Sequence, residues 1–312
     1  MEPALSDTAA MCAPGGGQTR ARHPDSEGIL ARGSVRIRWE SYGRGTPTIL
    51  LLPTWSIIHS RCWKMQIHEL ARRHHVLTFD PRGNGGSDRP TDPAAYAEDE
   101  FAADALALMD ATNTEDVVVV ALSLGAQRAL ILAGEHPARV RGLVLVGPLF
   151  NLERPLGPER QAAVEFDTDS GVDEGWGRYN AHSWRRDYPG FVEFFFGEVF
   201  SEAHSTKQIE DCVGWGLETD AETLIAAEVP GLEVARTREL CARVRCPVLV
   251  VHGDKDAIVP HEIGVHAAAL TGGRMVTLEG SGHCPHARDP VRFNILLRQF
   301  VSSLRVPAAG GD

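Results

Sequence analysis

A serine stands at the end of the most apolar run in this chain. Residues 117–122 read Val-Val-Val-Val-Ala-Leu, Ser123 follows, and a stretch with helical spacing begins at Gly125. Where a buried strand turns sharply into a helix, the residue at the turn is exposed in strained backbone geometry, which suits a nucleophilic hydroxyl. The small residues Ala121 and Gly125 allow strand and helix to meet. Serine is also a common helix N-cap, so the segment alone leaves both interpretations open.

A nucleophilic serine needs a base, and the base needs an acid that orients it. Candidates for both follow two later apolar runs, 248–251 and 275–278, and are Asp254, Asp256, His283 and His286. All of them fall after strand-like runs, so we expect them at the same sheet edge as Ser123. Spacing alone does not separate Asp254 from Asp256. The order along the chain is serine, aspartate, histidine.

The elements that must position these residues alternate between strand and helix. Continuous apolar runs predict buried strands at 48–52, 75–80, 117–122, 143–146, 248–252 and 275–278. Helical spacing covers 62–73, 101–109, 261–270 and 290–304. The segment 35–39 alternates between apolar and polar residues, which predicts an antiparallel edge strand. Such alternation predicts an α/β fold, a mostly parallel sheet with helices on both faces.

The alternation stops near residue 148 and resumes near residue 246. The segment between holds Trp176, Trp184, Phe191, Phe194, Phe195, Phe196, Phe200 and Trp215. We expect 149–245 to be a helical lid inserted after the sixth strand, above the sheet edge where open α/β sheets bind ligands. The core then comprises 26–148 and 246–306. The termini, 1–25 and 307–312, are expected to be disordered tails.

Composition excludes several classes of partner. The 312 residues carry a formal net charge of −11, which argues against nucleic acids and anionic membranes. No apolar run is long enough for a bilayer-spanning helix, and the N-terminal segment has no signal-peptide pattern. The six cysteines show no paired metal spacing. We therefore expect a cytoplasmic protein that uses no cofactor and no metal.

Four segments together resemble the α/β-hydrolase superfamily, in its lid-bearing branch of esterases, lactonases, C–C bond hydrolases and cofactor-free haloperoxidase-like enzymes. They read Asp-Pro-Arg-Gly-Asn-Gly-Gly-Ser at 80–87, Ala-Leu-Ser-Leu-Gly at 121–125, Gly-Asp-Lys-Asp at 253–256 and Gly-His-Cys-Pro-His at 282–286. The resemblance implies Ser123 as nucleophile, Asp256 as orienting acid and His283 as base. The family pattern places the acid four residues before a proline, which selects Asp256. His286 is then a packing or capping residue.

The resemblance also implies an oxyanion hole made by the backbone N–H groups of Leu124 and Trp55. In the family this loop usually opens with His-Gly, whereas here Pro53 and Thr54 stand before Trp55. Proline has no N–H and threonine replaces glycine, so the loop departs from the family pattern.

Four residues are candidates for the substrate pocket: Trp55, His59, Trp184 and Phe195. The Trp55 side chain is either a wall of the acyl pocket or an anchor for the lid. His59 either touches substrate or is solvated. Helical phase does not say which aromatic residue of the insertion faces the pocket.

The expected reaction is hydrolysis of a small-to-medium apolar ester or lactone through an acyl-enzyme, because serine and not aspartate occupies the nucleophile position. C–C bond and thioester hydrolysis use the same triad and remain alternatives, as does a ligand-binding homologue without activity. The partner is then a small apolar molecule. The sequence does not set the oligomeric state.

Overall fold

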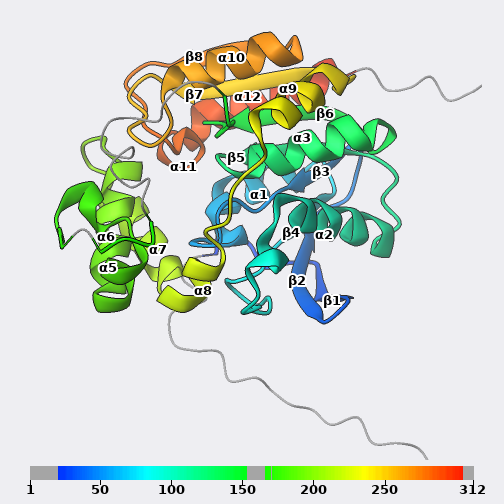
Figure 1. The fold of residues 1–312 in the computed structure, drawn as a ribbon. Coiled ribbons are helices and arrows are strands. Elements are labelled where there is room, and N and C mark those ends of the chain that lie inside the picture. Colours follow the sequence, from blue (N-terminus) through cyan, green and yellow to red (C-terminus); the bar gives the residue numbers. More distant parts are fainter. Residues whose placement is uncertain (1–19, 153–165, 170, 305–312) are drawn as a thin grey trace, which may run out of the picture.

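The computed structural model describes residues 20–152, 166–169 and 171–304, and an eight-stranded sheet forms its centre (Figure 1). The strands lie side by side in the order β1-β2-β4-β3-β5-β6-β7-β8. The pairs β1·β2 and β2·β4 are antiparallel and the remaining pairs are parallel, which confirms the mostly parallel sheet. The strands span Ser26–Arg32 (β1), Val35–Tyr42 (β2), Thr48–Leu51 (β3), Val76–Phe79 (β4), Val117–Leu122 (β5), Val140–Val146 (β6), Val248–Gly253 (β7) and Arg274–Leu278 (β8).

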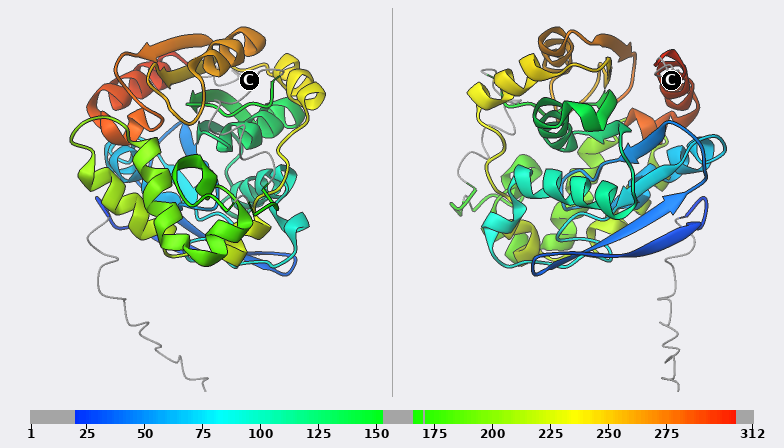
Figure 2. Two further views of the ribbon diagram at one scale, coloured as in Figure 1. Left: turned by 60° about the vertical axis from the view of Figure 1, so that its left-hand side comes forward. Right: turned by 90° about the vertical axis from the view of Figure 1, so that its right-hand side faces the viewer.

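Helices cover both faces of this sheet (Figure 2). One layer consists of Glu98–Ala111 (α2), Gly125–Glu135 (α3), Val234–Arg243 (α9) and His261–Thr271 (α10). The other layer consists of Lys64–Leu70 (α1), Pro285–Arg288 (α11) and Pro290–Ser303 (α12). Within the described residues, no helix has the length and apolar character needed to cross a membrane.

The central strand β5 shows why the apolar runs become strands. All six of its residues are buried, and it is paired in parallel with β3 on one side and β6 on the other. A parallel strand with helices on both faces has no solvated side, so it reads as a continuous apolar run instead of an alternating one. Its β-branched valines suit this environment. The strand ends directly before Ser123, at the edge of the sheet formed by the carboxyl ends of the parallel strands.

The expected edge strand at 35–39 is wrong in its position. This segment belongs to β2, which is paired on both sides, and the true edge strand is β1. β1 has no fully buried residue, and its sequence Ser-Glu-Gly-Ile-Leu-Ala-Arg shows no clear alternation of apolar and polar residues. The first 19 residues of the expected N-terminal tail lie outside the described residues, as does 307–312. Arg20, within that expected tail, is paired with the buried Glu40 at 2.6 Å.

The helical insertion follows β6, the sixth strand, as expected. Its helices are Ala181–Arg186 (α5), Tyr188–Val199 (α6), Thr206–Gly216 (α7) and Ala221–Ala226 (α8), grouped beside the sheet in Figure 1. The structure differs from the expected boundary at 245, since α9 packs on α3 and α10 in the core layer. The sequence could not separate α9 from the insertion, because both are helical and no strand lies between them.

Candidate active site

Ser123 occupies a strained turn between β5 and α3. Its φ is 51°, a left-handed conformation that non-glycine residues rarely adopt. The turn is held by the backbone: Ser123 N–H donates to the Val146 carbonyl at 2.9 Å, and its carbonyl accepts from Leu149 N–H at 3.1 Å. A Cβ on Gly125 would lie 2.8 Å from the Pro53 carbonyl oxygen, so only glycine fits two residues after the serine. The structure therefore has the strand–turn–helix geometry expected from the sequence.

His283 and Asp256 meet at the same sheet edge. His283 Nδ1 lies 2.7 Å from Asp256 Oδ2, and the Asp256 side chain is 0 % exposed. The other carboxylate oxygen, Oδ1, accepts the backbone N–H groups of Ile258 and Val259, each at 2.8 Å. These bonds fix the carboxylate from both ends.

The charge state of Asp256 determines the tautomer of His283. Burial alone would raise the pKa of Asp256, but the His283 charge and hydrogen bonds from two imidazoles hold it well below its usual range. An ionised carboxylate only accepts hydrogen bonds, so Nδ1 of His283 carries the proton. The Nε2 atom is then bare and can accept a proton from a hydroxyl.

A second imidazole, from His252, reaches the same carboxylate oxygen. Its Nε2 lies 2.9 Å from Asp256 Oδ2 and 3.1 Å from the Val259 carbonyl. His252 is fully buried, so it contacts the acid from behind and not the cavity. Sequence reasoning missed it, although it stands at the end of the run 248–252, whose other residues are apolar.

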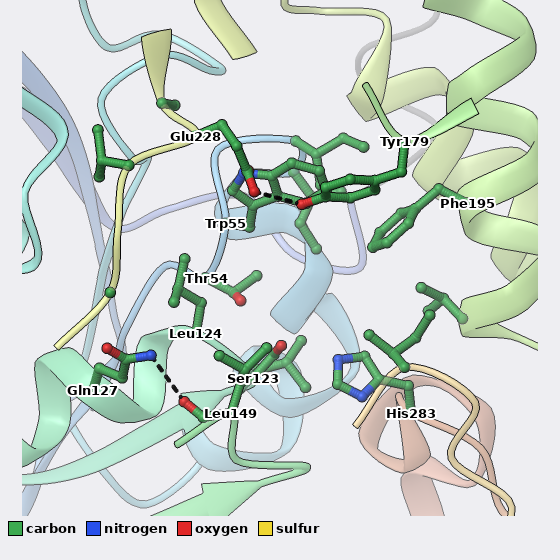
Figure 3. A pocket seen from close by; sticks show the side chains of 18 of the residues that line it. Thr54, Trp55, Ser123, Leu124, Gln127, Leu149, Tyr179, Phe195, Glu228 and His283 are labelled. Carbon is green, nitrogen blue, oxygen red and sulfur yellow. Dashed lines mark hydrogen bonds between the residues drawn. The ribbon is translucent and has the colours of Figure 1, made fainter. Parts of the chain in front are cut away.

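A cavity of about 270 Å³ opens beside these residues. Ser123, Leu124 and His283 line it at one end, and Figure 3 shows the His283 ring directed toward the Ser123 side chain. Trp55, Phe195 and further residues of the insertion line the rest of the cavity. The serine and the imidazole thus share one cavity, while Asp256 lies behind His283.

Two backbone N–H groups at the cavity have no acceptor in the described part of the chain. They belong to Leu124, which follows the serine, and to Trp55, on the loop after β3. These are the two donors that the resemblance implied for an oxyanion. Free N–H groups beside a nucleophile can stabilise negative charge that develops on a carbonyl oxygen.

The loop that carries Trp55 is held by a buried arginine that sequence reasoning missed. Arg128 Nη1 donates to the carbonyls of Pro53 and Thr54, at 3.0 and 2.6 Å. Its Nε donates to Glu98 at 2.8 Å, and both side chains are almost fully buried. The guanidinium therefore fixes the loop that carries Trp55. A charged residue inside the apolar helix α3 was the available signal.

The four residues expected in the pocket do not all reach it. Trp55 and Phe195 line the cavity, with ring centroids 5.2 Å apart. Trp184 does not line it; it is 0 % exposed and packs behind Trp55 and Phe191. His59 also lies away from the cavity and is buried, with Nε2 3.4 Å from Glu218, so it is neither a pocket residue nor solvated.

The two rejected alternatives for acid and base have other contacts. Asp254 is exposed and accepts the Gly280 N–H at 2.6 Å, and within the described residues His283 forms its ion pair with Asp256 instead. His286 is buried against Trp63, with ring centroids 4.7 Å apart. Burial lowers the pKa of His286 to about 3, so this imidazole is neutral at neutral pH.

The polar end of the cavity was not anticipated. Gln127, Asn151 and Glu228 line it, and the Tyr179 hydroxyl donates to Glu228 at 2.8 Å. Gln127 accepts the Leu232 N–H at 2.6 Å and donates to the Leu149 carbonyl at 3.1 Å. Across the described ranges, no three His, Cys, Asp or Glu residues gather closely enough to hold a metal ion.

Comparison with known proteins identifies the family. The model of the α/β hydrolase fold family matches residues 47–290, and the chain belongs to that family. A 2-hydroxymuconate semialdehyde hydrolase of Pseudomonas sp. (strain CF600) is 27 % identical, with 88 % of this chain and 93 % of that protein covered. The human serine hydrolase BPHL is 28 % identical over 87 % of this chain and 85 % of that protein.

A solved structure gives the same result. The esterase RhEst1 from Rhodococcus sp. ECU1013 superposes with a TM-score of 0.73 at 25 % sequence identity, covering 90 % of this chain and 99 % of that one. Fold and relatives agree that the chain is an α/β-fold hydrolase enzyme. The family membership expected from the four sequence segments is confirmed.

Proposed function

We propose that this enzyme hydrolyses a small-to-medium apolar ester or lactone through a Ser123–His283–Asp256 triad. The observation that carries the proposal is the bond of 2.7 Å between His283 Nδ1 and Asp256, beside a cavity that also holds Ser123 at φ 51°. An oriented base beside a strained serine is the arrangement that activates a hydroxyl.

The reaction would run in two halves. His283 Nε2 takes the Ser123 proton as Oγ attacks the substrate carbonyl, and the N–H groups of Trp55 and Leu124 stabilise the oxyanion. His283 then gives its proton to the leaving alcohol. In the second half it activates water, which releases the acid from Ser123. Asp256 keeps the imidazole in the required tautomer and stabilises the imidazolium.

The walls of the cavity support an apolar substrate. Apolar side chains form much of the cavity wall: Ile57, Ile58, Phe195, Phe196, Val199 and Ile258. Burial of apolar surface there stabilises a bound acyl group by about 25 cal/mol per Å². The helices α5–α8 act in this proposal as the lid that sets the acyl group, since α6 supplies Phe195, Phe196 and Val199.

The proposed compartment is a reducing cytoplasm. The five cysteines in the part of the chain that the structure describes carry free thiols. Proteins of oxidising compartments more often pair their cysteines.

C–C bond hydrolysis is a second candidate. The similarity to an enzyme named for 2-hydroxymuconate semialdehyde favours it. It would use the same base and nucleophile, so only substrates distinguish the two.

A substrate panel combined with active-site labelling tests the proposal. The panel contains p-nitrophenyl esters of graded chain length, several lactones and a β-diketone. A fluorophosphonate probe, located by peptide mass spectrometry, reports whether Ser123 is activated. We expect labelling of Ser123 and turnover of esters or lactones. A protein that is not labelled and turns over none of these substrates is a ligand-binding homologue, and the proposal is then wrong.

A further inference from the structure

Thr54 places a buried hydroxyl in the cavity where the family's loop has glycine. The residue is 5 % exposed and lines the cavity together with Ser123 and Leu124. Its Oγ1 is buried and has no hydrogen-bond partner among the described residues. Figure 3 shows the Thr54 side chain above Leu124, on the same side of the cavity as Ser123. The triad and the two backbone donors leave this hydroxyl without a role.

The position of Thr54 is tightly fixed. Its Cα lies 3.7 Å from the point where a Cβ on Gly125 would stand, so the loop touches the turn that carries Ser123. Its carbonyl accepts from Arg128 Nη1 at 2.6 Å, and Arg128 does not line the cavity. The carbonyl thus points toward Arg128, and the side chain is left to face the cavity. The ion pair of Arg128 with Glu98 makes this orientation rigid.

An unpaired buried hydroxyl is costly for a folded protein, at about 1–3 kcal/mol. The cost disappears when a bound molecule supplies an acceptor. The acceptor that every candidate substrate brings to this end of the cavity is its carbonyl oxygen, which also must meet the N–H groups of Trp55 and Leu124. Donors that are fixed before the reaction stabilise the transition state most, because they need no reorganisation.

We propose that the Thr54 hydroxyl is a third oxyanion donor, beside the N–H groups of Trp55 and Leu124; this inference rests on the proposed function. As Ser123 Oγ bonds to the carbonyl carbon, its proton moves to His283 and the C=O π pair moves to the oxygen. Thr54 Oγ1–H donates to that oxygen without giving up its proton. When the C=O bond re-forms, the bond to the leaving group breaks and His283 returns the proton to it.

The test compares three variants with the wild-type enzyme. Thr54→Val removes the hydroxyl at nearly constant shape, and Thr54→Ser keeps it. Thr219→Val is the matched control, because Thr219 Oγ1 is also buried, has no hydrogen-bond partner in the described ranges, and does not line the cavity. The measurements are kcat and KM on the best ester and thermal unfolding of each variant.

We expect Thr54→Val to lower kcat by about 10²-fold, the size of the loss of one oxyanion donor in other hydrolases. KM should change little, since the bond strengthens only as charge develops. Thr54→Ser should restore most of kcat, and Thr219→Val should leave it unchanged. If Thr54 had only a structural role, Thr54→Val would lower the unfolding temperature. It would not lower kcat while leaving KM unchanged.

Two results would overturn the inference, and they can be told apart by whether the wild-type enzyme is active. If Thr54→Val keeps kcat within twofold of an active wild-type enzyme, the third donor is wrong and the proposed function stands. If the wild-type enzyme is neither labelled nor active, both fail. If Thr54→Val does not fold, the pair Thr54→Ala and Thr54→Ser decides, and equal kcat values in that pair refute the role of the hydroxyl.

Discussion

The sheet edge that carries the candidate triad and the helical insertion above it are held by different forces. At the edge, the carboxylate of Asp256 accepts two backbone N–H groups and contacts two imidazole nitrogens, all at 2.7–2.9 Å. In the insertion, a cluster of aromatic rings packs together, for example Trp184 on Phe191 at 4.5 Å between centroids. Hydrogen bonds are directional and fix atoms to tenths of an ångström, whereas ring packing accepts several geometries.

This difference separates chemistry from selectivity. The atoms that would make and break bonds stand on core loops, and the insertion contributes apolar walls. Trp55 joins the two regions, because its backbone lies in the oxyanion loop and its ring packs on Tyr179, Trp184, Phe191 and Phe195. Substitutions on either side should therefore have effects of different kind as well as of different size.

The largest effect is expected at the edge, for Ser123→Ala. This change removes the atom that forms the covalent bond, and loss of the nucleophile of a serine protease costs about 10⁶-fold in kcat. Ester turnover by purified protein and circular dichroism check the loss and the intact fold. If the variant keeps a tenth of the wild-type rate, the nucleophile lies elsewhere. The assignment of the chemistry to this sheet edge is then wrong.

A second change, Asp256→Asn, tests the hydrogen-bond network itself. An amide in place of the carboxylate favours the wrong tautomer of His283, and the same change in a serine protease costs about 10⁴-fold in kcat. Asp254→Asn is the matched control, because Asp254 is exposed and its carboxylate accepts the Gly280 N–H instead of contacting His283. Steady-state kinetics of both variants should rank them in that order; the reverse order would contradict the assignment of the acid.

In the insertion, two aromatic substitutions should behave differently from each other. Phe195→Ala removes a cavity wall and should shift the chain-length preference by about 1–3 kcal/mol, or about 10–200-fold between neighbouring substrates. Trp184→Ala should instead cost about 3–5 kcal/mol of stability, since this side chain is 0 % exposed and outside the cavity. The ester panel and thermal unfolding separate the two. Loss of fluorophosphonate labelling in Phe195→Ala would show that the insertion takes part in the chemistry.

The smallest effect is expected for His286, which lowers the stability of the folded protein at acid pH. Burial lowers the pKa of His286 to about 3, below the ordinary value of about 6.5. Between these values the unfolded chain binds a proton that the folded chain does not, so stability falls as pH falls. His286→Phe removes this contribution and should make the loss of stability between pH 6.5 and 5.5 smaller by about 1 kcal/mol, or a few degrees in Tm. If the unfolding temperatures of the wild-type protein and His286→Phe fall equally as the pH is lowered, this role of His286 is wrong.

Much of the architecture could be read from short stretches of sequence. The alternation of apolar runs and helical segments predicted the parallel sheet, and the insertion after the sixth strand, because burial on both faces imposes its pattern on each strand separately. Ser123 could be placed at a strand–helix turn for the same reason. The edge strand was misplaced because β1 has no buried residue and its sequence shows no clear apolar pattern.

What the sequence by itself determined is therefore local: which runs are strands, where the serine turn lies, and the order of the candidate residues. Only the tertiary structure decided that Asp256 and not Asp254 meets His283, since residues 27 positions apart come together through the turn after β7. It also decided that Phe195 faces the cavity while Trp184 and His59 do not, and that Arg128 holds the Pro53 and Thr54 carbonyls. Periodicity describes one element at a time, whereas each of these contacts depends on how separate elements pack.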